Sequence, residues 1–327
     1  MKIGIIGGGV WGSSLAKLLS NNQVKIFARN KKIVDSINDH HFNPNLKYSI
    51  FNDNVKATRI INDLSDSDYV FIALPSQSIR EVLVEFNPTN IKQEIIIASK
   101  GIEINSMLLL SEVLDELKKF NNIHILSGPC FSDEVSQNLP TAVSFASKNK
   151  DSFKNISKLF INKNFRMYYS EDIIGCQIGG ALKNIYAIGA GITMGLNLGE
   201  NAKSALITRS FIEIVNFAKN LGGKEKTIFG LSGLGDLILT CNSLKSRNTV
   251  FGKLISSTKN PNIRNILEFQ QITEGYYTTQ AVKKIADKRK INMPILNSIY
   301  NILYNKHSIS DEINNLLERP ITDEFKK

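Results

Sequence analysis

Three glycines near the start of the chain are spaced for binding a phosphate. Gly7, Gly9 and Gly12 follow a β-branched run over residues 2–6 and lead into an apolar stretch over residues 13–20. In a strand–turn–helix unit the first glycine permits a tight turn, the second lets the backbone approach a pyrophosphate, and the third allows close packing of helix and strand. Because a second strand is expected soon afterwards, the pattern predicts dinucleotide binding rather than a turn that serves packing alone.

The segment after the second expected strand bears on which dinucleotide is bound. An Asp or Glu at this place would bind the ribose 2′-hydroxyl of NAD(H). Residues 27–32 instead read FARNKK, with no acidic side chain. Arg29 therefore suits the 2′-phosphate of NADPH, and we expect NADP(H) to be favoured over NAD(H). A solvated basic turn is the alternative.

Lys183 is the only charged residue between Ile173 and Gly199. That stretch has the length of a membrane span, but a charge at its middle would be expensive there, and its glycines suit a helix packed closely in protein. Burial disfavours the charged form of a lysine and lowers its pKa toward the range that serves acid–base catalysis. Lys183 is thus a candidate catalytic residue. A lysine that reaches solvent from a helix is the alternative.

A second glycine-rich passage covers residues 230–241 and is followed by Ser246, Arg247 and Asn248. Arg247 and Asn248 would lie at the start of a helix, where backbone N–H groups and a planar guanidinium can bind a phosphate. Asp236 lies within the passage. The alternative is that Asp236 and Ser246 only cap the helices that follow them.

Three further turns follow expected strands, at residues 74–77 (LPSQ), 98–101 (ASKG) and 127–130 (SGPC). In open α/β sheets, ligands gather at the carboxyl ends of the strands. Lys100 and Gly128 are therefore well placed to face a cofactor and a substrate. Ordinary strand-to-helix turns are the alternative at all three places.

The elements that would position these residues fall into two groups. Strands are expected over residues 2–6, 24–28, 69–74, 94–99, 124–126, 141–145 and 165–169. Runs such as YVFIAL lack polar alternation, which indicates a parallel sheet covered by helices on both faces. Helical periodicity follows over residues 173–194, 201–221, 247–256, 279–288 and 294–305. The sequence therefore predicts an α/β fold, with an N-terminal Rossmann-type doubly wound sheet (residues 1–175) followed by an all-helical C-terminal domain (residues 176–327).

Composition argues against several other classes of protein. The chain has 327 residues, 42% of them hydrophobic, which suits two packed domains. Its three cysteines lie far apart and its four histidines form no metal-binding motif, so we expect no disulfide framework, no metal and a cytoplasmic location. The net charge of +10 raises nucleic-acid binding as an alternative. Because the basic residues form no stripe, we instead expect anionic small-molecule ligands, no nucleic acid and no membrane span.

These segments together resemble a known enzyme family. The motifs GGGVWG, LPSQ, SKGIE, SGPCFSDEV, GGALKNIYAIGAGI, NAKSALITR, GLSGLGDLILTC, SRN and TEGYYT follow the order of the bacterial-type NAD(P)-dependent glycerol-3-phosphate dehydrogenases. The resemblance implies reversible interconversion of sn-glycerol 3-phosphate and dihydroxyacetone phosphate with NAD(P)+/NAD(P)H, supplying glycerol 3-phosphate for phospholipid biosynthesis. It also implies a homodimer. A reductase of the same architecture that acts on a hydroxy acid is the nearest alternative, and the SRN segment argues against it.

The resemblance assigns roles to individual residues. Lys183 matches the family's proton donor and acceptor, with Asp236 and Thr240 beside it. The positions that match the substrate site are Lys100, Gly128, Cys130, Lys183, Asn184, Asp236, Ser246, Arg247 and Asn248. The positions that match the cofactor site are Gly7, Gly9, Val10, Trp11, Gly12, Arg29, Pro75, Lys100, Ser132, Arg247, Ile272 and Glu274.

Three of these positions depart from the family's pattern. Val10 stands where Ser or another small residue is common, Cys130 where Ser or Thr is usual, and Ser132 where Ala is usual. We expect these departures to alter individual side-chain contacts. The backbone amides that do most of the phosphate binding should be unaffected.

Overall fold

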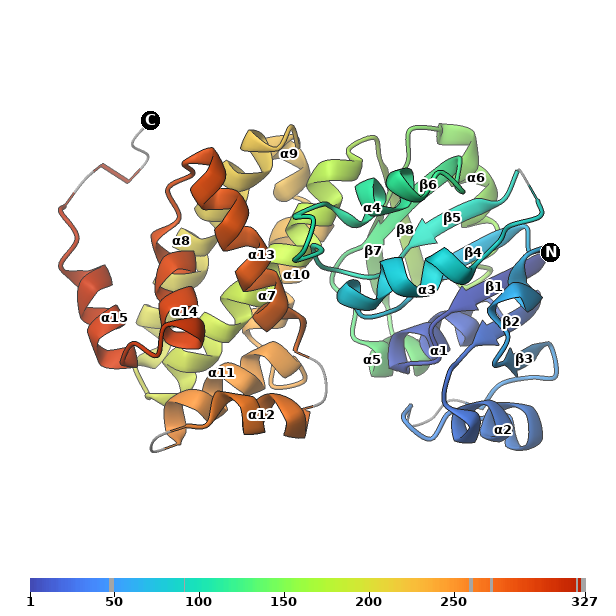
Figure 1. The fold of residues 1–327 in the computed structure, drawn as a ribbon, viewed down its shortest axis with the longest axis horizontal. Coiled ribbons are helices and arrows are strands. Elements are labelled where there is room, and N and C mark those ends of the chain that lie inside the picture. The colour runs from blue at the N-terminus through green and yellow to red at the C-terminus, as the bar shows by residue number, and fades with distance from the viewer. Residues whose placement is uncertain (47–49, 91, 259–260, 271–272, 322, 325–327) are drawn as a thin grey trace.

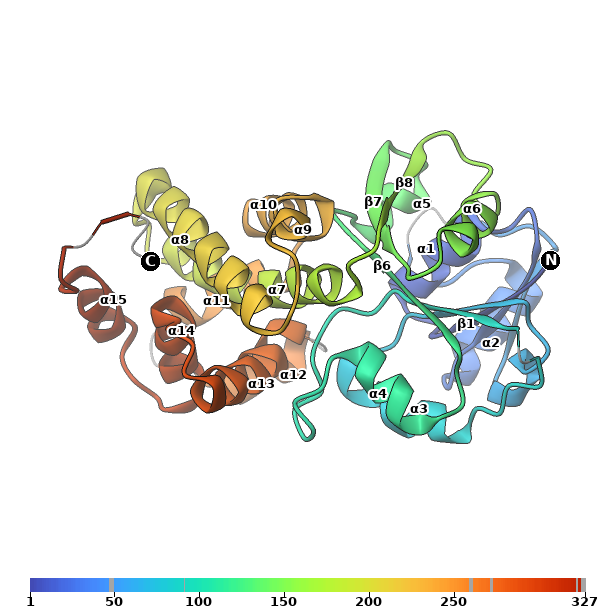
Figure 2. The same ribbon diagram turned by 90° about the horizontal axis from the view of Figure 1, so that it is seen from above.

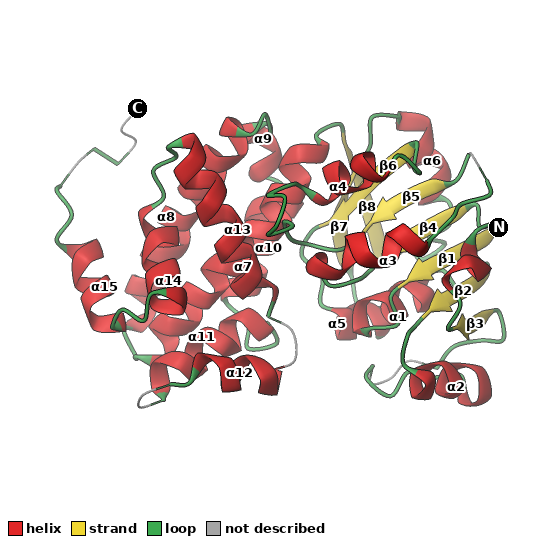
Figure 3. Ribbon diagram, viewed as in Figure 1, coloured by secondary structure: helices red, strands yellow, loops and turns green. Residues whose placement is uncertain are grey.

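The chain folds into a sheet-containing N-terminal part and a helical C-terminal part, which lie side by side along the long axis of the molecule (Figure 1). The computed structural model describes residues 1–46, 50–90, 92–258, 261–270, 273–321 and 323–324. Figure 3 shows that the strands are confined to the N-terminal part, whereas helices occur throughout.

The sheet has eight strands in the order β3-β2-β1-β4-β5-β6-β7-β8. Neighbouring strands are parallel except β6 and β7, which pair antiparallel. The strands are β1 (Lys2–Ile6), β2 (Gln23–Phe27), β3 (Val55–Thr58), β4 (Tyr69–Ile72), β5 (Glu94–Ile97), β6 (Asn122–Ser127), β7 (Thr141–Ala146) and β8 (Phe165–Ser170). In the central register Ile5 lies beside Ile26 and Phe71, and all three side chains are fully buried.

Helices cover both faces of the sheet, as Figure 2 shows. One face carries α1 (Val10–Leu18), α5 (Ser132–Ser136) and α6 (Lys150–Ser157), and the other carries α3 (Ile79–Glu85) and α4 (Leu110–Leu117). The remaining elements of this part are α2 (Lys31–His40), which packs against β3, and two 3-10 turns, η1 (Ile61–Leu64) and η2 (Ser76–Ser78). This two-sided cover explains the uninterrupted apolar runs of the central strands.

The helical part is built around α7 (Ile173–Gly195), whose side chains are buried over most of its length. Its other elements are α8 (Gly199–Asn220), α9 (Glu225–Ile228), a π-type turn η3 (Leu231–Gly235), α10 (Asp236–Cys241), α11 (Arg247–Ser257), α12 (Ile263–Gln270), α13 (Glu274–Arg289), α14 (Pro294–Tyr304) and α15 (Ile309–Leu317). Glycines allow α7 and α11 to cross closely. A Cβ added to Gly191 would lie 2.1 Å from the Thr249 carbonyl oxygen, and one added to Gly252 would lie 2.0 Å from that of Ile188.

The fold class predicted from the sequence is confirmed, but several details were wrong. The short edge strand β3 was missed because four residues with one alternation carry little signal. The sheet is not purely parallel, since β7 is antiparallel to β6. α1 begins at Val10 rather than at residue 13, because Gly12 lies inside the helix, where it packs on the Gly7 carbonyl.

The helical part also differs from the prediction. α13 begins at Glu274, five residues before the predicted start at Thr279, because its glycine and tyrosines obscure the apolar period of its first turn. The helices α12 and α15 were not predicted. Within the described part of the chain, no helix is both long enough and apolar enough to cross a membrane.

Candidate active site

The glycine-rich turn leads from β1 into the N-terminus of α1. Gly7 has φ +131°, and a Cβ there would lie 2.4 Å from the Ala73 carbonyl oxygen, so both its conformation and its surroundings require glycine. A Cβ on Gly9 would meet no atom of the described residues within 4 Å. The first turn of α1 contains no acidic residue. Its free N–H groups and the open backbone at Gly9 therefore suit a pyrophosphate.

Side chains on α1 and α5 border this turn. Trp11 donates its indole N–H to the Ala98 carbonyl at 3.1 Å, which joins α1 to the end of β5. Ser14 donates its hydroxyl to the Ser132 carbonyl at 2.8 Å, which joins α1 to α5. Val10 is the first residue of α1 and is partly exposed beside the turn. The predicted cofactor residues of the sheet part thus lie along one edge of the sheet.

Arg29 lies just beyond the carboxyl end of β2, with 67% of its side chain exposed. Its guanidinium is 4.0 Å from the carboxylate of Glu81 on α3, an exposed pair that salt would screen strongly. Asn30 caps α2 by accepting a hydrogen bond from the Lys32 N–H at 2.9 Å. The guanidinium of Arg29 is therefore accessible from solvent at the strand end.

Lys183 is buried on α7 and has two partners from α10. Its ammonium donates to Asp236 Oδ1 at 2.7 Å and to Thr240 Oγ1 at 2.8 Å. Thr240 in turn donates to the carbonyl oxygen of Asp236 at 2.6 Å, so its hydroxyl oxygen is free to accept from the lysine. The three residues predicted as a catalytic group lie together.

Lys100 approaches the same carboxylate from the sheet part. It follows β5, and its ammonium donates to Asp236 Oδ2 at 2.6 Å and to the Gly128 carbonyl at 2.8 Å. Gly180 of α7 leaves room for this approach, since a Cβ there would lie 2.5 Å from Ser127 Oγ and 3.4 Å from Lys100 Cγ. Asp236, which is fully buried and does not cap its helix, thus bridges two ammonium groups from the two parts of the molecule.

The cluster of Lys100, Lys183 and Asp236 contains two cations and one anion, which favours an additional anionic group beside it. Burial lowers the pKa of Lys183, and the charge of Lys100 lowers it further, against the opposing effect of Asp236. Burial alone would also lower the pKa of Lys100, but the charges of Asp236 and Cys130 and the hydrogen bond to Asp236 together outweigh it and raise that pKa. Lys183 is therefore the lysine whose proton is more readily given up.

Cys130 lies in the turn after β6, where its thiol donates to the Gly128 carbonyl at 3.3 Å. Burial raises the pKa of Cys130, so the side chain remains a thiol at neutral pH. Gly128 has φ +151°, a conformation that suits glycine, and its carbonyl accepts from both Cys130 and Lys100. The turn therefore borders the lysine cluster.

The SRN segment forms the start of α11. Ser246 caps this helix, since its hydroxyl accepts from the Thr249 N–H at 3.2 Å, as the alternative interpretation of the sequence had it. Arg247 is exposed at the first helical position. Asn248 is buried and donates to Asn184 Oδ1 at 2.9 Å, which places the segment one residue along α7 from Lys183.

Glu274 begins α13 and contacts the sheet part. Its carboxylate accepts from the backbone N–H of Ser76 at 3.0 Å and from the hydroxyl of Ser76 at 2.6 Å. Pro75 precedes Ser76 in the turn after β4. Ile272, the remaining residue predicted to contact the cofactor, lies outside the described residues.

Comparison with known proteins decides the family. Residues 2–153 match the NAD-dependent glycerol-3-phosphate dehydrogenase N-terminus model, and residues 172–314 match the C-terminus model. The chain belongs to this family. It is 39% identical over 330 residues to the glycerol-3-phosphate dehydrogenase [NAD(P)+] of Zymomonas mobilis, covering 99% of this chain and 94% of the relative, and 38% identical over 338 residues to that of Bacillus subtilis, covering 99% and 96%.

A solved structure supports the same conclusion for this member of the family. The glycerol-3-phosphate dehydrogenase of Coxiella burnetii superposes with a TM-score of 0.91 at 34% identity, covering 97% of this chain and 99% of that one. The resemblance stated from the sequence motifs is therefore confirmed. The roles of the single residues stay predictions.

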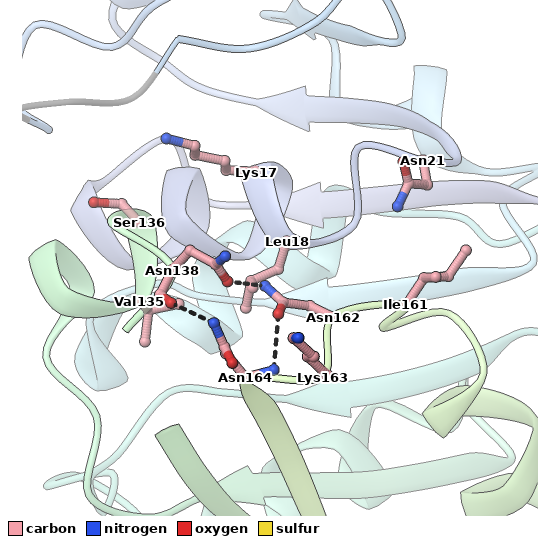
Figure 4. A pocket seen from close by; sticks show the side chains of 10 residues that line it. All are labelled: Lys17, Leu18, Asn21, Val135, Ser136, Asn138, Ile161, Asn162, Lys163 and Asn164. Atoms are coloured by element: carbon pink, nitrogen blue, oxygen red, sulfur yellow. Dashed lines mark hydrogen bonds between the residues drawn. The ribbon is translucent and has the colours of Figure 1, made fainter. Parts of the chain in front are cut away.

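Two features of the described residues lie outside this site. One is a pocket at the far end of α1 from the glycine turn, lined by Lys17, Leu18, Asn21, Val135, Ser136, Asn138, Ile161, Asn162, Lys163 and Asn164 (Figure 4). Three of its asparagines are linked by hydrogen bonds. The carboxamide of Asn162 donates to that of Asn138, and the carboxamide of Asn164 donates to the backbone carbonyl of Asn138 at 2.9 Å. The other feature is a buried network of Tyr186 and Glu213, which sequence reasoning missed because neither residue belongs to a recognisable motif. Among the residues described, no group of His, Cys, Asp and Glu could hold a metal ion.

Proposed function

We propose that this member of the family reduces dihydroxyacetone phosphate reversibly to sn-glycerol 3-phosphate for phospholipid synthesis, with Lys183 as the proton donor. The observation that carries the proposal is the buried carboxylate of Asp236, which binds Lys183 on one oxygen at 2.7 Å and Lys100 on the other at 2.6 Å. The arrangement holds an acidic ammonium in a water-poor site. Such a group is what a ketone oxygen needs as it gains charge.

The residues at the edge of the sheet fit a nicotinamide dinucleotide. The free N–H groups of α1 and the open backbone at Gly9 would hold its pyrophosphate. We expect the cofactor to pass Trp11, Pro75, Ser132 and Glu274 between this turn and the lysine cluster. When bound, the nicotinamide supplies the hydride for the ketone carbon.

The lysine cluster would complete the reduction. Lys183 gives its proton to the ketone oxygen, and Asp236 with Thr240 fixes its ammonium in place beforehand. Stabilisation of a developing oxyanion by one preorganised donor contributes about 2.7 to 4 kcal/mol in comparable sites. Lys100 supplies the second positive charge of the cluster, on the other oxygen of Asp236.

The phosphate of the substrate would lie at the start of α11. Arg247 offers a planar donor fork, and the N-terminal N–H groups of the helix add further donors. Asn248 and Asn184 form a carboxamide pair between this end and Lys183. Binding energy from the remote phosphate would hold the carbonyl carbon within reach of the hydride.

We further propose that NADPH binds better than NADH. Residues 27–32 contain no acid to bind a ribose 2′-hydroxyl, and the exposed Arg29 is available for a 2′-phosphate. Glu81, 4.0 Å away, opposes that preference, since its carboxylate would repel the phosphate. Arg29 and Glu81 together would therefore set the cofactor ratio.

The family resemblance also supports a homodimer, a cytoplasmic location and a division of labour between residues 1–175, which bind the cofactor, and residues 176–327, which bind the substrate. The last strand, β8, ends at Ser170 and the long helix α7 begins at Ile173, close to that division. Analytical ultracentrifugation of the purified chain would test the dimer, because a monomer would sediment as 36.5 kDa.

The function is tested by following NADPH consumption with dihydroxyacetone phosphate, with unphosphorylated dihydroxyacetone and with a 2-oxo acid in parallel. The proposal predicts turnover with the phosphorylated ketone and at least about a tenfold lower kcat/KM with dihydroxyacetone, because a charge-assisted phosphate contact is lost. Preference for the 2-oxo acid would instead support the hydroxy-acid reductase alternative.

A further inference from the structure

The first turn of α13 fastens the helical part of the molecule to the sheet part. Glu274 Oε1 accepts from the Ser76 backbone N–H at 3.0 Å, and Oε2 accepts from the Ser76 hydroxyl at 2.6 Å. The two residues are 198 positions apart in sequence, and Ser76 is only 1% exposed. Both oxygens of one carboxylate are therefore used on a single residue of the other part.

We propose that Ser76 is a positioning residue, which acts through Glu274 to hold the two parts of the molecule closed around the cofactor. We call the Ser76–Glu274 pair the interdomain clasp. The proposal rests on the proposed function in one respect, namely that Glu274 faces the cofactor. Neither the dinucleotide turn at Gly7 nor the lysine cluster requires Ser76 directly.

On the sheet side the clasp continues into the loop that carries Lys100. The Ser76 hydroxyl donates to the carboxylate, so it can accept from Gln77 Nε2, which lies at 3.0 Å. The same carboxamide donates to the Ile102 carbonyl at 2.8 Å and accepts from the Ile104 N–H at 3.0 Å. The clasp therefore orders the backbone that directly follows Lys100.

Gly101 shows how closely this loop meets the clasp. A Cβ added to Gly101 would lie 2.5 Å from the Ser76 Cβ and 3.1 Å from Glu274 Oε2. The residue that follows Lys100 thus has to be small for the clasp to form. The clasp and the position of Lys100 are coupled by packing as well as by hydrogen bonds.

On the helical side the clasp continues toward Lys183. The N–H of Gly275, next to Glu274, donates to Asn248 Oδ1 at 2.9 Å. A backbone N–H can only donate, so the Asn248 oxygen must face it and the Asn248 amide nitrogen must point to Asn184 Oδ1, at 2.9 Å. Asn184 adjoins Lys183 on α7. A shift of the first turn of α13 would therefore move the carboxamide beside the proton donor.

The charge state of Glu274 sets the strength of the clasp. Burial raises the pKa of Glu274, whereas the two hydrogen bonds from Ser76 and the charge of Arg247 on α11 lower it. Only the ionised carboxylate accepts from both donors of Ser76 at full strength. Removal of the Ser76 hydroxyl would therefore weaken the clasp and also raise the pKa of Glu274 further.

Fluorescence titration with NADH between pH 5.5 and pH 9 tests the clasp. NADH is chosen because the 2′-phosphate of NADPH would itself titrate near pH 6. The variants are Ser76→Ala, Glu274→Gln and the double variant. The matched control is Ser78→Ala in the same 3-10 turn, because the Ser78 hydroxyl makes no hydrogen bond to a described residue and does not cap α3. Circular dichroism checks that each variant is folded, and turnover of dihydroxyacetone phosphate is measured beside each titration.

We expect Ser76→Ala to weaken NADH about tenfold at neutral pH, as loss of a hydrogen bond to a charged group would. Its affinity should also begin to fall at a higher pH than that of the wild type as the solution is acidified. Glu274→Gln should remove this pH dependence, the double variant should match Glu274→Gln alone, and Ser78→Ala should match the wild type. Turnover with dihydroxyacetone phosphate should also fall in Ser76→Ala, because the clasp positions the loop that carries Lys100 and the Asn184 side chain beside Lys183.

Two results would overturn the clasp. One is a Ser76→Ala variant whose NADH affinity and pH profile are unchanged. The other is a double variant whose loss of NADH affinity equals the product of the losses in the two single variants. A wild type that binds NADH with the expected profile but does not turn over dihydroxyacetone phosphate would contradict the proposed function and support the clasp alone. The two claims therefore fail separately.

Discussion

Two buried carboxylates, Asp236 and Glu213, bind side chains that lie about one turn apart on α7. They are stabilised in opposite ways. Asp236 lies opposite Lys183 and binds two ammonium groups. Glu213 of α8 accepts the hydroxyl of Tyr186 at 3.0 Å and the N–H groups of Ile295 and Leu296, at 2.7 and 3.1 Å, at the start of α14.

The difference shows which buried acid is suited to chemistry. Burial raises the pKa of Glu213 to about 7, and the helix N-terminus only partly offsets that effect. The groups around Glu213 hold three helices together and present no proton donor to a ligand. The groups around Asp236 include a lysine whose pKa is lowered by burial. Buried charge alone therefore does not identify a catalytic site; the type of partner does.

Asp236→Asn should have the largest effect on the comparison. It leaves Lys183 and Lys100 without a counterion, so we expect kcat to fall at least about a hundredfold and the free energy of unfolding to fall by about 3 kcal/mol or more. The pKa of Lys183 should also fall further, so that any residual reduction is lost at a lower pH as the solution becomes alkaline. Urea unfolding measures the change in the free energy of unfolding, and a pH–rate profile measures the changes in kcat and in the pKa of Lys183. A pH–rate profile like that of the wild type would contradict the assigned role of Asp236.

Glu213→Gln should make the free energy of unfolding less dependent on pH and leave catalysis nearly unchanged. The pKa of Glu213 is raised from 4.5 to about 7 in the folded state, so the folded state binds the proton more tightly and loses stability as pH rises through that window. Between pH 5.5 and pH 8 the loss from this one group is about 2 kcal/mol. Urea unfolding at the two pH values should show the wild type losing more stability than Glu213→Gln. Equal losses would count against the raised pKa.

Arg247→Ala should weaken the phosphorylated substrate without disturbing the buried cluster. Arg247 is exposed, so we expect kcat/KM for dihydroxyacetone phosphate to fall about tenfold and the preference over dihydroxyacetone to shrink. The control is dihydroxyacetone itself, whose kcat/KM should change little. Equal losses with the two ketones would show that Arg247 does not bind the phosphate.

Arg29→Ala should have the smallest effect, confined to one cofactor. We expect the Kd of NADPH to rise by up to about tenfold, less if solvent screens the exposed guanidinium, and that of NADH to stay within a few-fold. Glu81→Gln should act in the opposite direction and favour NADPH. Titrations at one ionic strength measure both variants, and equal losses for the two cofactors would mean that Arg29 stacks on the adenine.

The sequence predicted the fold class well because its signals are local. Glycine spacing, uninterrupted apolar strands and helical periodicity can each be recognised within a short stretch of sequence. It could not show that Lys100, from a strand end, and Lys183, from a helix, meet on one carboxylate, since three separate segments must first pack. The Ser76–Glu274 contact was also invisible, although both motifs were noticed, because 198 residues separate them.

Chemical rescue of Lys183→Ala tests the central claim most directly. The variant should lose at least about a hundredfold in kcat while binding NADPH almost normally, as expected for loss of acid–base catalysis. Added methylammonium should restore part of the rate, because it brings an acidic N–H into the space left beside Asp236, whereas tetramethylammonium should not. Near-normal turnover by the variant, or equal responses to the two cations, would contradict the assignment of Lys183 as the proton donor.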